Sequence, residues 1–227
     1  MFEALFSRYD RLVLFDTETT GLDFARDEII EFAAVVVENQ NGNIVITQEY
    51  DQLISLSPGM RIPPEIEKLT GITNQDVQEK GISKEQVCRD IFQMFTGNTL
   101  LLAYNAHFDL SFLFYLLLRN GDPTVLKGKD KLDLLTVYKD RASYPHKLCN
   151  AIAHYGLEGK VVNSHRAVDD VIATVEVMKA MEAEKDDIMR YVNLFGYHPT
   201  YGLGSKPIGS VTYKPQPYDC PIPLYQQ

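Results

Sequence analysis

The sequence has little cysteine, no tryptophan and no long apolar run, and these absences exclude several classes of protein. Its 227 residues include three cysteines, Cys88, Cys149 and Cys220, none of them in a C-x-x-C spacing, so neither a disulfide framework nor a zinc site is indicated. The longest apolar stretch, 112–118, is far too short to span a bilayer. The first eleven residues lack the continuous apolar core of a signal peptide. We therefore expect a soluble, cytoplasmic protein with no membrane partner.

Basic residues are also scarce, because 22 Lys and Arg face 31 Asp and Glu, giving a formal net charge of −9. A protein that coats nucleic acid neutralises phosphates with a broad basic surface, and this balance excludes such a coat. Segment 127–147 differs from the rest, with six basic residues against three acids, and it is either a solvated face or a phosphate-binding surface. The hydrophobic content of 45% is typical of a globular chain, and the length suits one main domain.

Apolar periodicity predicts strands that first precede and then alternate with helices. Three apolar or β-branched runs come first, and Asn41-Gly42-Asn43 between the second and third is a strong hairpin turn. Later apolar runs alternate with segments of helical spacing, one of which opens with a Ser83–Gln86 capping box. We therefore expect an α/β fold in which helices pack on a mixed sheet with an antiparallel meander. The expected strands are 12–15, 29–37, 44–53, 100–104 and 131–135, and the expected helices are 65–69, 83–95, 108–119, 146–154 and 166–181.

The last 32 residues have a composition of their own. Segment 196–227 holds six of the eleven prolines and five of the thirteen tyrosines, and prolines at that density exclude helices and central strands. The segment is either an extended arm lying on the domain or on a partner, or a disordered extension, and the regular tyrosines favour the arm. We therefore expect a main domain over 1–195 and a Pro/Tyr-rich extension over 196–227.

Two acids stand at the end of the first expected strand. Asp16 and Glu18 are two residues apart, and the alternation of a strand points both side chains to the same face. Carboxylates this close repel each other unless a divalent cation lies between them, although Asp16 taken alone serves equally well as a turn cap. Thr19 and Thr20 follow, and then Gly21 lets the backbone bend back so that its amide groups face whatever lies beside the carboxylates.

Three further chemistry-bearing residues lie at expected helix starts. Asp109 occupies the first turn of an apolar helix, where an acid commonly stabilises the helix dipole. His165 and Asp170 are five residues apart, which on one continuous helix corresponds to a rotation of about 140°. The two side chains can therefore approach one point only if Ser164 or His165 stands at the helix start. Asp169 would then point away as a solvated surface acid.

Taken together, these motifs resemble those of the DEDDh family of 3′–5′ exonucleases. The D-x-E pair at 16–18, N-x-x-x-D at 105–109 and H-x4-D at 165–170, with Leu69-Thr70-Gly71-Ile72 between the first two, match that family in order and separation. The resemblance covers about residues 8 to 182 and is to the proofreading exonucleases of bacterial replicative DNA polymerases and related RNase-T-like enzymes. It implies an RNase H-like α/β fold with a mixed five-stranded sheet and helices on both faces, and it makes 1–195 the exonuclease domain.

The resemblance also implies a catalytic and metal-binding set. Asp16, Glu18, Asp109 and Asp170 match the four carboxylates that hold two Mg²⁺ or Mn²⁺ ions, and His165 matches the general base. Paired divalent ions stabilise charge on the attacking and leaving oxygens of a phosphodiester, and hard ions prefer carboxylate oxygens. An imidazole with a pKa near 6.5 is suited to take a proton from water at neutral pH. The chemistry of the residue types therefore agrees with the roles that the family implies.

Substrate contacts are implied around the same motifs. The segment with Thr17, Thr19, Gly21 and Leu22 resembles the part of the family that holds the 3′-terminal nucleotide, with Leu22 wedged against the last base. Three further residues, Thr70, Asn105 and Phe108, stand where the family reaches the same nucleotide. For Asn105 and Phe108, loop capping and core packing explain the residues equally well.

The implied function is a metal-dependent 3′–5′ exonuclease that releases nucleoside 5′-monophosphates from a single-stranded or frayed 3′ end of DNA. Its implied setting is proofreading during DNA replication, with a DNA polymerase subunit or a second copy of the chain as a protein partner. Two alternatives stay open at this stage. One is an exoribonuclease acting on short RNA or RNA 3′ ends, since the choice depends on which group meets the 2′-hydroxyl. The other is a non-catalytic assembly module of a polymerase complex, docked through the tail.

Overall fold

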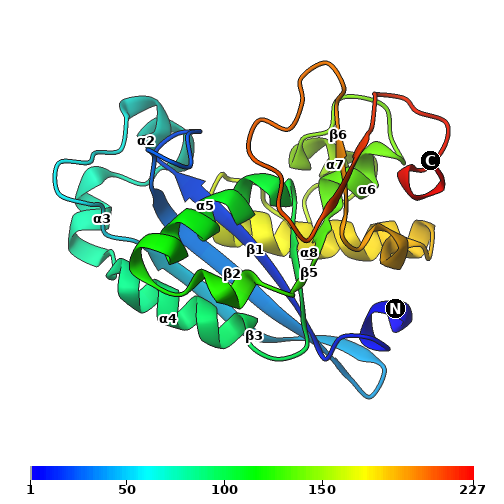
Figure 1. The fold of residues 1–227 in the computed structure, drawn as a ribbon, viewed down its shortest axis with the longest axis horizontal. Helices are drawn as coiled ribbons and strands as arrows, with labels where there is room; N and C mark the ends of the chain where they lie inside the picture. Colours follow the sequence, from blue (N-terminus) through cyan, green and yellow to red (C-terminus); the bar gives the residue numbers. More distant parts are fainter. Residues whose placement is uncertain (1) are drawn as a thin grey trace.

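A five-stranded mixed sheet forms the centre of the molecule (Figure 1). The computed structural model describes residues 2–227. The strand order is β3-β2-β1-β4-β5, in which the first three strands form an antiparallel meander and the last two run parallel to β1. The expected mixed sheet is confirmed. Its strands are β1 (Arg11–Thr19), β2 (Ile29–Gln40), β3 (Asn43–Leu53), β4 (Thr99–Ala103) and β5 (Asp130–Asp133).

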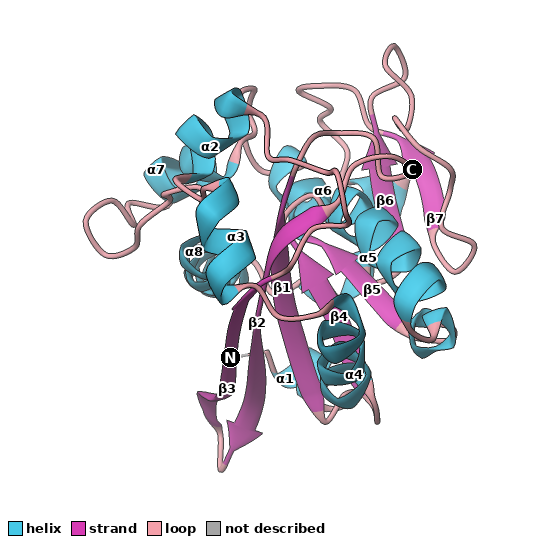
Figure 2. Ribbon diagram, turned by 90° about the vertical axis from the view of Figure 1, so that its left-hand side faces the viewer, coloured by secondary structure: helices cyan, strands magenta, loops and turns pink. Residues whose placement is uncertain are grey.

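Helices cover both faces of this sheet, and β1 shows why. Its alternate residues are buried on opposite sides, because Leu12 and Leu14 pack in one core cluster while Val13 and Phe15 pack in the other. The first cluster includes residues of α6 (Leu134–Lys139), α7 (Leu148–His154) and α8 (Ala167–Glu184), and the second includes residues of α4 (Lys84–Phe95) and α5 (Ala106–Asn120). Figure 2 shows α8 on one side of the sheet and α4 and α5 on the other. Between residues 2 and 227, no helix has the length and apolarity to cross a membrane.

The remaining short elements frame the sheet. Helix α2 extends one residue beyond each end of the expected 65–69 and is terminated by Gly71, whose φ of 71° is left-handed and favours glycine. Helix α3 was not predicted, although Thr73 and Asp76 form a reciprocal capping box at its start. A small cluster around Ile30, Ile62 and Val77 packs both helices against the sheet. The short elements are α1 (Glu3–Phe6), α2 (Pro64–Thr70), α3 (Asn74–Lys80), η1 (Pro123–Leu126) and η2 (Ile188–Tyr191).

The strand predicted over 131–135 ends two residues earlier in the structure, at Asp133. The strand β5 stops at Asp133, whose carboxylate accepts hydrogen bonds from the backbone N–H groups of Leu135 and Thr136. This is the geometry of a helix N-cap, so helix α6 begins at Leu134. The apolar residues after Asp133 therefore belong to a short helix.

The Pro/Tyr-rich tail is an ordered arm that lies on the domain. Strand β6 (Leu194–Tyr197) pairs in parallel with β7 (Thr212–Pro215), and a short turn, η3 (Leu224–Gln226), follows. Gln216 is 1% exposed, and its amide group donates hydrogen bonds to Thr136 and Asp140. Leu224 is fully buried in the same core cluster as α8. Of the two alternatives for this segment, the structure shows the arm.

We predict that Leu224 anchors this arm measurably. Replacing a fully buried leucine by alanine leaves a cavity and typically costs about 2–5 kcal/mol, so Leu224→Ala should lower the free energy of unfolding by about that amount. Ile222→Ala is the matched control, because Ile222 lies two residues away and is 50% exposed. Urea unfolding followed by circular dichroism gives both values, and equal stability of the two variants would contradict the packing of the arm.

Candidate active site

Asp16 and Glu18 lie near the carboxyl end of the central strand β1, on the face of the sheet that α8 covers. They continue the alternation of Leu12 and Leu14, and both are half-buried at the carboxyl end of the strand. The two side chains therefore lie on the same face of the sheet, as expected.

Helix α5 brings Asp109 to the same place. The helix starts after Asn105, whose φ of 70° is left-handed, and Asp109 is 3% exposed. One oxygen of Asp109, Oδ1, accepts hydrogen bonds from the backbone N–H of Thr17, at 3.0 Å, and from the Thr17 hydroxyl, at 2.7 Å. Thr17 lies between Asp16 and Glu18 in the sequence, so this pair of bonds fixes Asp109 beside both acids. The Asp109 carboxylate therefore does not only stabilise the dipole of α5; it also joins the start of that helix to β1.

The start of α5 is itself held by Asp133 at the end of β5. The Oδ1 atom of Asp133 accepts hydrogen bonds from the backbone N–H groups of Asn105 and Ala106, each at 3.0 Å. The same carboxylate caps α6, so one buried side chain positions two helix starts. The sequence analysis did not single out Asp133.

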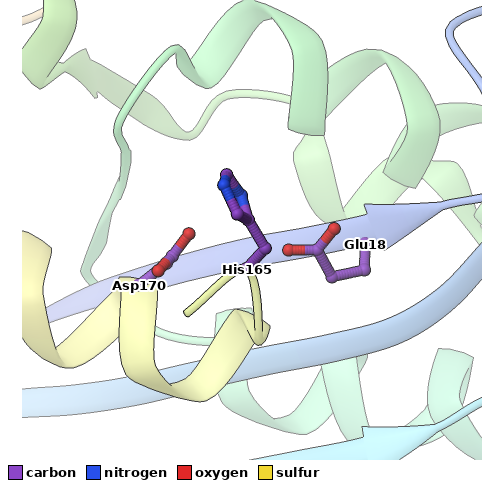
Figure 3. A group of neighbouring side chains, drawn as sticks. All are labelled: Glu18, His165 and Asp170. Atoms are coloured by element: carbon purple, nitrogen blue, oxygen red, sulfur yellow. The ribbon is translucent and has the colours of Figure 1, made fainter. Parts of the chain in front are cut away.

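Helix α8 supplies His165 and Asp170 from opposite sides of its start. His165 precedes the helix with a left-handed φ of 57° and is exposed, whereas Asp170 is 8% exposed inside the first turns. Asn163 donates a hydrogen bond of 2.7 Å to Asp170. Figure 3 shows the side chains of Glu18, His165 and Asp170 turned toward one another, and one ligand atom from each lies within 4.8 Å of the others. The expected placement of His165 before the helix is therefore observed.

A buried glutamate that the sequence analysis missed anchors the start of α8. Glu31 is completely buried and stands opposite Glu18 in the β1–β2 register. It forms an ion pair with Arg166 and accepts a hydrogen bond of 2.8 Å from the backbone N–H of Ala167, the first residue of α8. The signal was an acid inside the apolar run 29–37, because a charged residue in a buried strand requires a partner.

The electrostatics of these acids favour a bound cation. Burial, reinforced by repulsion from neighbouring carboxylates, raises the pKa of Asp16 well above its ordinary value and that of Glu18 to about 8. Burial also raises the pKa of Asp109 to about 7, against the hydrogen bonds from Thr17, and it raises the pKa of Asp170. Four crowded oxygen-donor groups of this kind fit hard divalent ions such as Mg²⁺ or Mn²⁺.

Of the predicted substrate contacts around β1, Thr17 and Thr19 use their hydroxyls in hydrogen bonds within the protein, whereas Leu22 faces solvent. Thr17 is bonded to Asp109, and the Thr19 hydroxyl donates to the carbonyl of Gly21 at 2.6 Å. A Cβ atom on Gly21 would lie 2.4 Å from the carboxylate of Asp27, so glycine is required here by close approach rather than by a positive φ. Leu22 is 82% exposed and is the one free to touch a ligand.

The other three predicted contacts differ among themselves. Thr70 is buried, and its hydroxyl donates to Ile66 and accepts from the backbone N–H of Ile72, so it stabilises the end of α2. Asn105 is exposed at the start of α5, and Phe108 is half-buried with its ring 4.9 Å from that of Phe112. The expected roles of all seven substrate-contact residues stay predictions.

Two readings of charge from the sequence need correction. Asp169 is half-buried and accepts a hydrogen bond from Ser164, so it supports the turn that carries His165 rather than lying free in solvent. Segment 127–147 is not a continuous basic surface, because Lys131 is 2% exposed and donates to Ser210, while Arg141 pairs with Asp187. Composition counts these charges but does not reveal their burial.

Comparison with known proteins agrees with this geometry. A family model described as Exonuclease matches residues 13–178. The DNA polymerase III subunit epsilon of Treponema pallidum is 32% identical over 173 residues, which are 74% of this chain and 75% of that protein. The PolC-type DNA polymerase III of Clostridium perfringens is 34% identical over 171 residues, which are 75% of this chain but 11% of that protein.

A solved structure of Escherichia coli exonuclease I in complex with a dA16 oligonucleotide is also similar, with a TM-score of 0.70 and 25% identity over 80% of this chain and 42% of that one. The chain thus spans about a tenth of the PolC-type relative and less than half of exonuclease I. Because the family match includes all three acidic motifs and extends over more than half of the sequence, the chain belongs to the exonuclease family, as the resemblance of its motifs indicated.

Proposed function

We propose that this protein is a metal-dependent 3′–5′ exonuclease that shortens single-stranded or frayed DNA from its 3′ end and releases nucleoside 5′-monophosphates. Two observations carry the proposal: ligand atoms of Glu18, His165 and Asp170 lie within 4.8 Å of one another, and Asp109 is hydrogen-bonded to Thr17, the residue between Asp16 and Glu18. The relatives support DNA as the substrate, since one is a DNA polymerase III subunit and another was solved with a DNA oligonucleotide. The same relatives support a DNA polymerase subunit as a partner.

In this proposal the four carboxylates hold two Mg²⁺ or Mn²⁺ ions. When bound, such ions stabilise negative charge on the attacking and leaving oxygens of a phosphodiester. Thr17 keeps Asp109 aligned for this task through two hydrogen bonds, and Asn163 does the same for Asp170. Two of the four proposed ligands are thus oriented by a neighbour, which is what a preorganised site requires.

His165 takes the proton from the attacking water. Its exposed position before α8 lets the imidazole reach a water molecule near Glu18 and Asp170, and imidazole is matched to proton transfer at neutral pH. The Glu31–Arg166 ion pair and the bond from Ala167 to Glu31 hold the backbone on which His165 stands. Glu31 is therefore a positioning residue.

We also propose that residues 1–195 form the exonuclease domain and 196–227 an extension, which the end of the family match at residue 178 supports. A cytoplasmic location completes the proposal. Its support is the cysteine set, because Cys88, Cys149 and Cys220 are all free and exported proteins commonly pair theirs.

The first prediction from the proposed function concerns the reaction itself. Single-stranded DNA labelled at its 5′ end should shorten to a ladder with Mg²⁺ or Mn²⁺ and stay intact with EDTA. Asp16→Asn should abolish the ladder because it removes one ligand charge, whereas Asp186→Asn, at an exposed site two residues beyond the end of α8, should cleave normally. Nicking of a closed circle, or unchanged cleavage by Asp16→Asn, would disprove the proposal. A matched RNA oligonucleotide at the same salt concentration tests the preference for DNA.

A second prediction separates the base from the ligands. His165→Ala should lower kcat by about a hundredfold or more, the usual contribution of a general base, while Mn²⁺ affinity stays unchanged by calorimetry. His154→Ala, at an exposed position on α7, is the control and should keep full kcat. Lost Mn²⁺ affinity in His165→Ala would make the histidine a ligand instead.

A third prediction follows from the raised pKa values. In the metal-free folded protein Glu18 keeps its proton up to about pH 8, whereas an unfolded glutamate loses it near pH 4.3. The folded state therefore binds more protons between these values, so the free energy of unfolding falls as pH rises through this window.

Thermal unfolding in EDTA should accordingly give a lower Tm at about pH 8.5 than at about pH 6, and Mg²⁺ should restore the loss because it binds the ionised carboxylates. Glu18→Gln should show a flatter dependence in EDTA. A wild-type Tm in EDTA that rises across this window, with the variant parallel to it, would contradict the electrostatic account of the site.

A further inference from the structure

A row of four aromatic rings, of which three are exposed and His198 is half-buried, joins the tail to the loop before α7. Neighbouring ring centroids lie 4.8 Å apart for Tyr201 and His198, 4.5 Å apart for His198 and Tyr218, and 4.9 Å apart for Tyr218 and Tyr144. We call these four residues the tyrosine row. Its two ends are open to solvent, since Tyr201 is 74% and Tyr144 is 63% exposed. Large aromatic side chains seldom form a contiguous exposed group on a folded protein, and where they do, the group indicates a binding surface.

A polar pocket connects the row to the active-site helix. The pocket has a volume of about 160 Å³, and its walls include Asn105 and His107 at the start of α5, Lys139 of α6, and His198 and Gly202 of the tail. Asn105 directly precedes the helix that carries Asp109, and His198 is a member of the row. The pocket therefore extends from the start of α5 to the tyrosine row.

The arm that carries most of the row is fixed relative to the catalytic acids. The ring nitrogen Nδ1 of His107 and the hydroxyl of Tyr213 lie at hydrogen-bond distance, 2.6 Å, and His107 also contacts Ser205. On the other side, the hydroxyl of Tyr104 donates to the carbonyl of His146 at 2.8 Å. In Figure 1 the arm, orange to red, runs past the start of α5 and over α6. The row thus holds a set position along a path that leads to the site.

Charge along this path suits a phosphate. Lys139 lines the pocket, and no residue between 2 and 227 accepts a hydrogen bond from its ammonium group, which is therefore open to a ligand. Asp133 is the pocket's acid, but its carboxylate already accepts the N–H groups at the starts of α5 and α6. The tail as a whole contains two lysines, Lys206 and Lys214, and one acid, Asp219, so it is less acidic than the chain, whose net charge is −9.

We propose that the pocket and the tyrosine row bind the single strand upstream of the 3′-terminal nucleotide, with Lys139 on a backbone phosphate and the open faces of Tyr201 and Tyr144 each under one of its bases. This inference rests on the proposed exonuclease function and assigns the Pro/Tyr-rich arm to substrate binding. Aromatic rings bind any base through its π-face, so the contact tolerates every sequence, as an enzyme that degrades strands of any sequence requires. A single strand also needs only a few cations when its bases stack, which agrees with an acidic protein.

The test compares substrates that reach the row with one that does not. The nitrophenyl ester of thymidine 5′-monophosphate occupies only the terminal position, whereas dT16 extends over the pocket and the row. Tyr201→Ala, Tyr144→Ala and Lys139→Met should each lower kcat/KM on dT16 by about tenfold, mostly through KM, because one stacked base or one phosphate contact is lost. On the ester all three should match the wild type.

Three control variants either keep the aromatic ring at position 201 or make the same kind of substitution outside the proposed site. Tyr201→Phe keeps the ring and should keep wild-type KM on dT16. Phe114→Ala removes an aromatic ring that is 43% exposed on α5 but outside the row, and Lys127→Met removes an exposed lysine of the basic segment. Both should leave dT16 cleavage unchanged. Fluorescence anisotropy of labelled dT16 in EDTA provides a second readout that does not require turnover, and Tyr201→Ala should weaken binding there too.

The outcomes are distinct. Wild-type KM on dT16 for both Tyr201→Ala and Lys139→Met would overturn the inference while leaving the exonuclease function intact. A wild-type protein that cleaves neither substrate would refute the proposed function, and the anisotropy measurement would then decide the inference alone, equal affinity of wild type and Tyr201→Ala overturning it. If the variants bind DNA normally but change the sedimentation of the protein from dimer to monomer, the row is a contact between copies of the chain and the inference is wrong.

Discussion

Burial of neighbouring acids at the end of β1 is the constraint on which the rest of the structure depends. Asp16, Glu18, Asp109 and Asp170 come from three elements that are separate in the sequence. Burial, followed by repulsion from nearby carboxylates, raises the pKa of each of them, so their ionised forms are held together at a cost. A protein keeps such an arrangement only if its scaffold overcomes the repulsion elsewhere. Here the opposing stabilisation comes from a sheet buried on both faces by two core clusters.

The scaffold transmits this stability through two further buried carboxylates, those of Asp133 and Glu31. Asp133 accepts the free N–H groups at the starts of α5 and α6, and Glu31 accepts that of α8 while pairing with Arg166. The first N–H groups of a helix have no partner within the helix, so each bond fixes a helix start, and the acids on α5 and α8 move only with those starts. The proposed active site is thus shaped by acids of two kinds: four that lie close together, and two, Asp133 and Glu31, whose carboxylates are paired by hydrogen bonds or an ion pair.

The amino-acid sequence predicts the sheet, the shared face of Asp16 and Glu18 and the position of His165 before its helix, because each depends on a local period. It does not predict that Asp109 and Asp170 meet them, since that depends on packing between distant segments, and this expectation came from the family resemblance. Glu31 was missed because its partner Arg166 is 135 residues away. Helix α3 was missed because it has one buried apolar residue, Val77, and so no apolar periodicity.

The position of Leu224 has a consequence for the order in which the molecule is built. The core cluster beneath α8 contains Phe2 and Leu5 from one end of the chain and Leu224 from the other. During synthesis, which proceeds from the N-terminus, this cluster stays incomplete until residue 224 has left the ribosome. The opposite cluster draws almost all of its members from residues 13–126 and can form much earlier. The sheet therefore matures one face at a time, and the face that bears the acids is completed last.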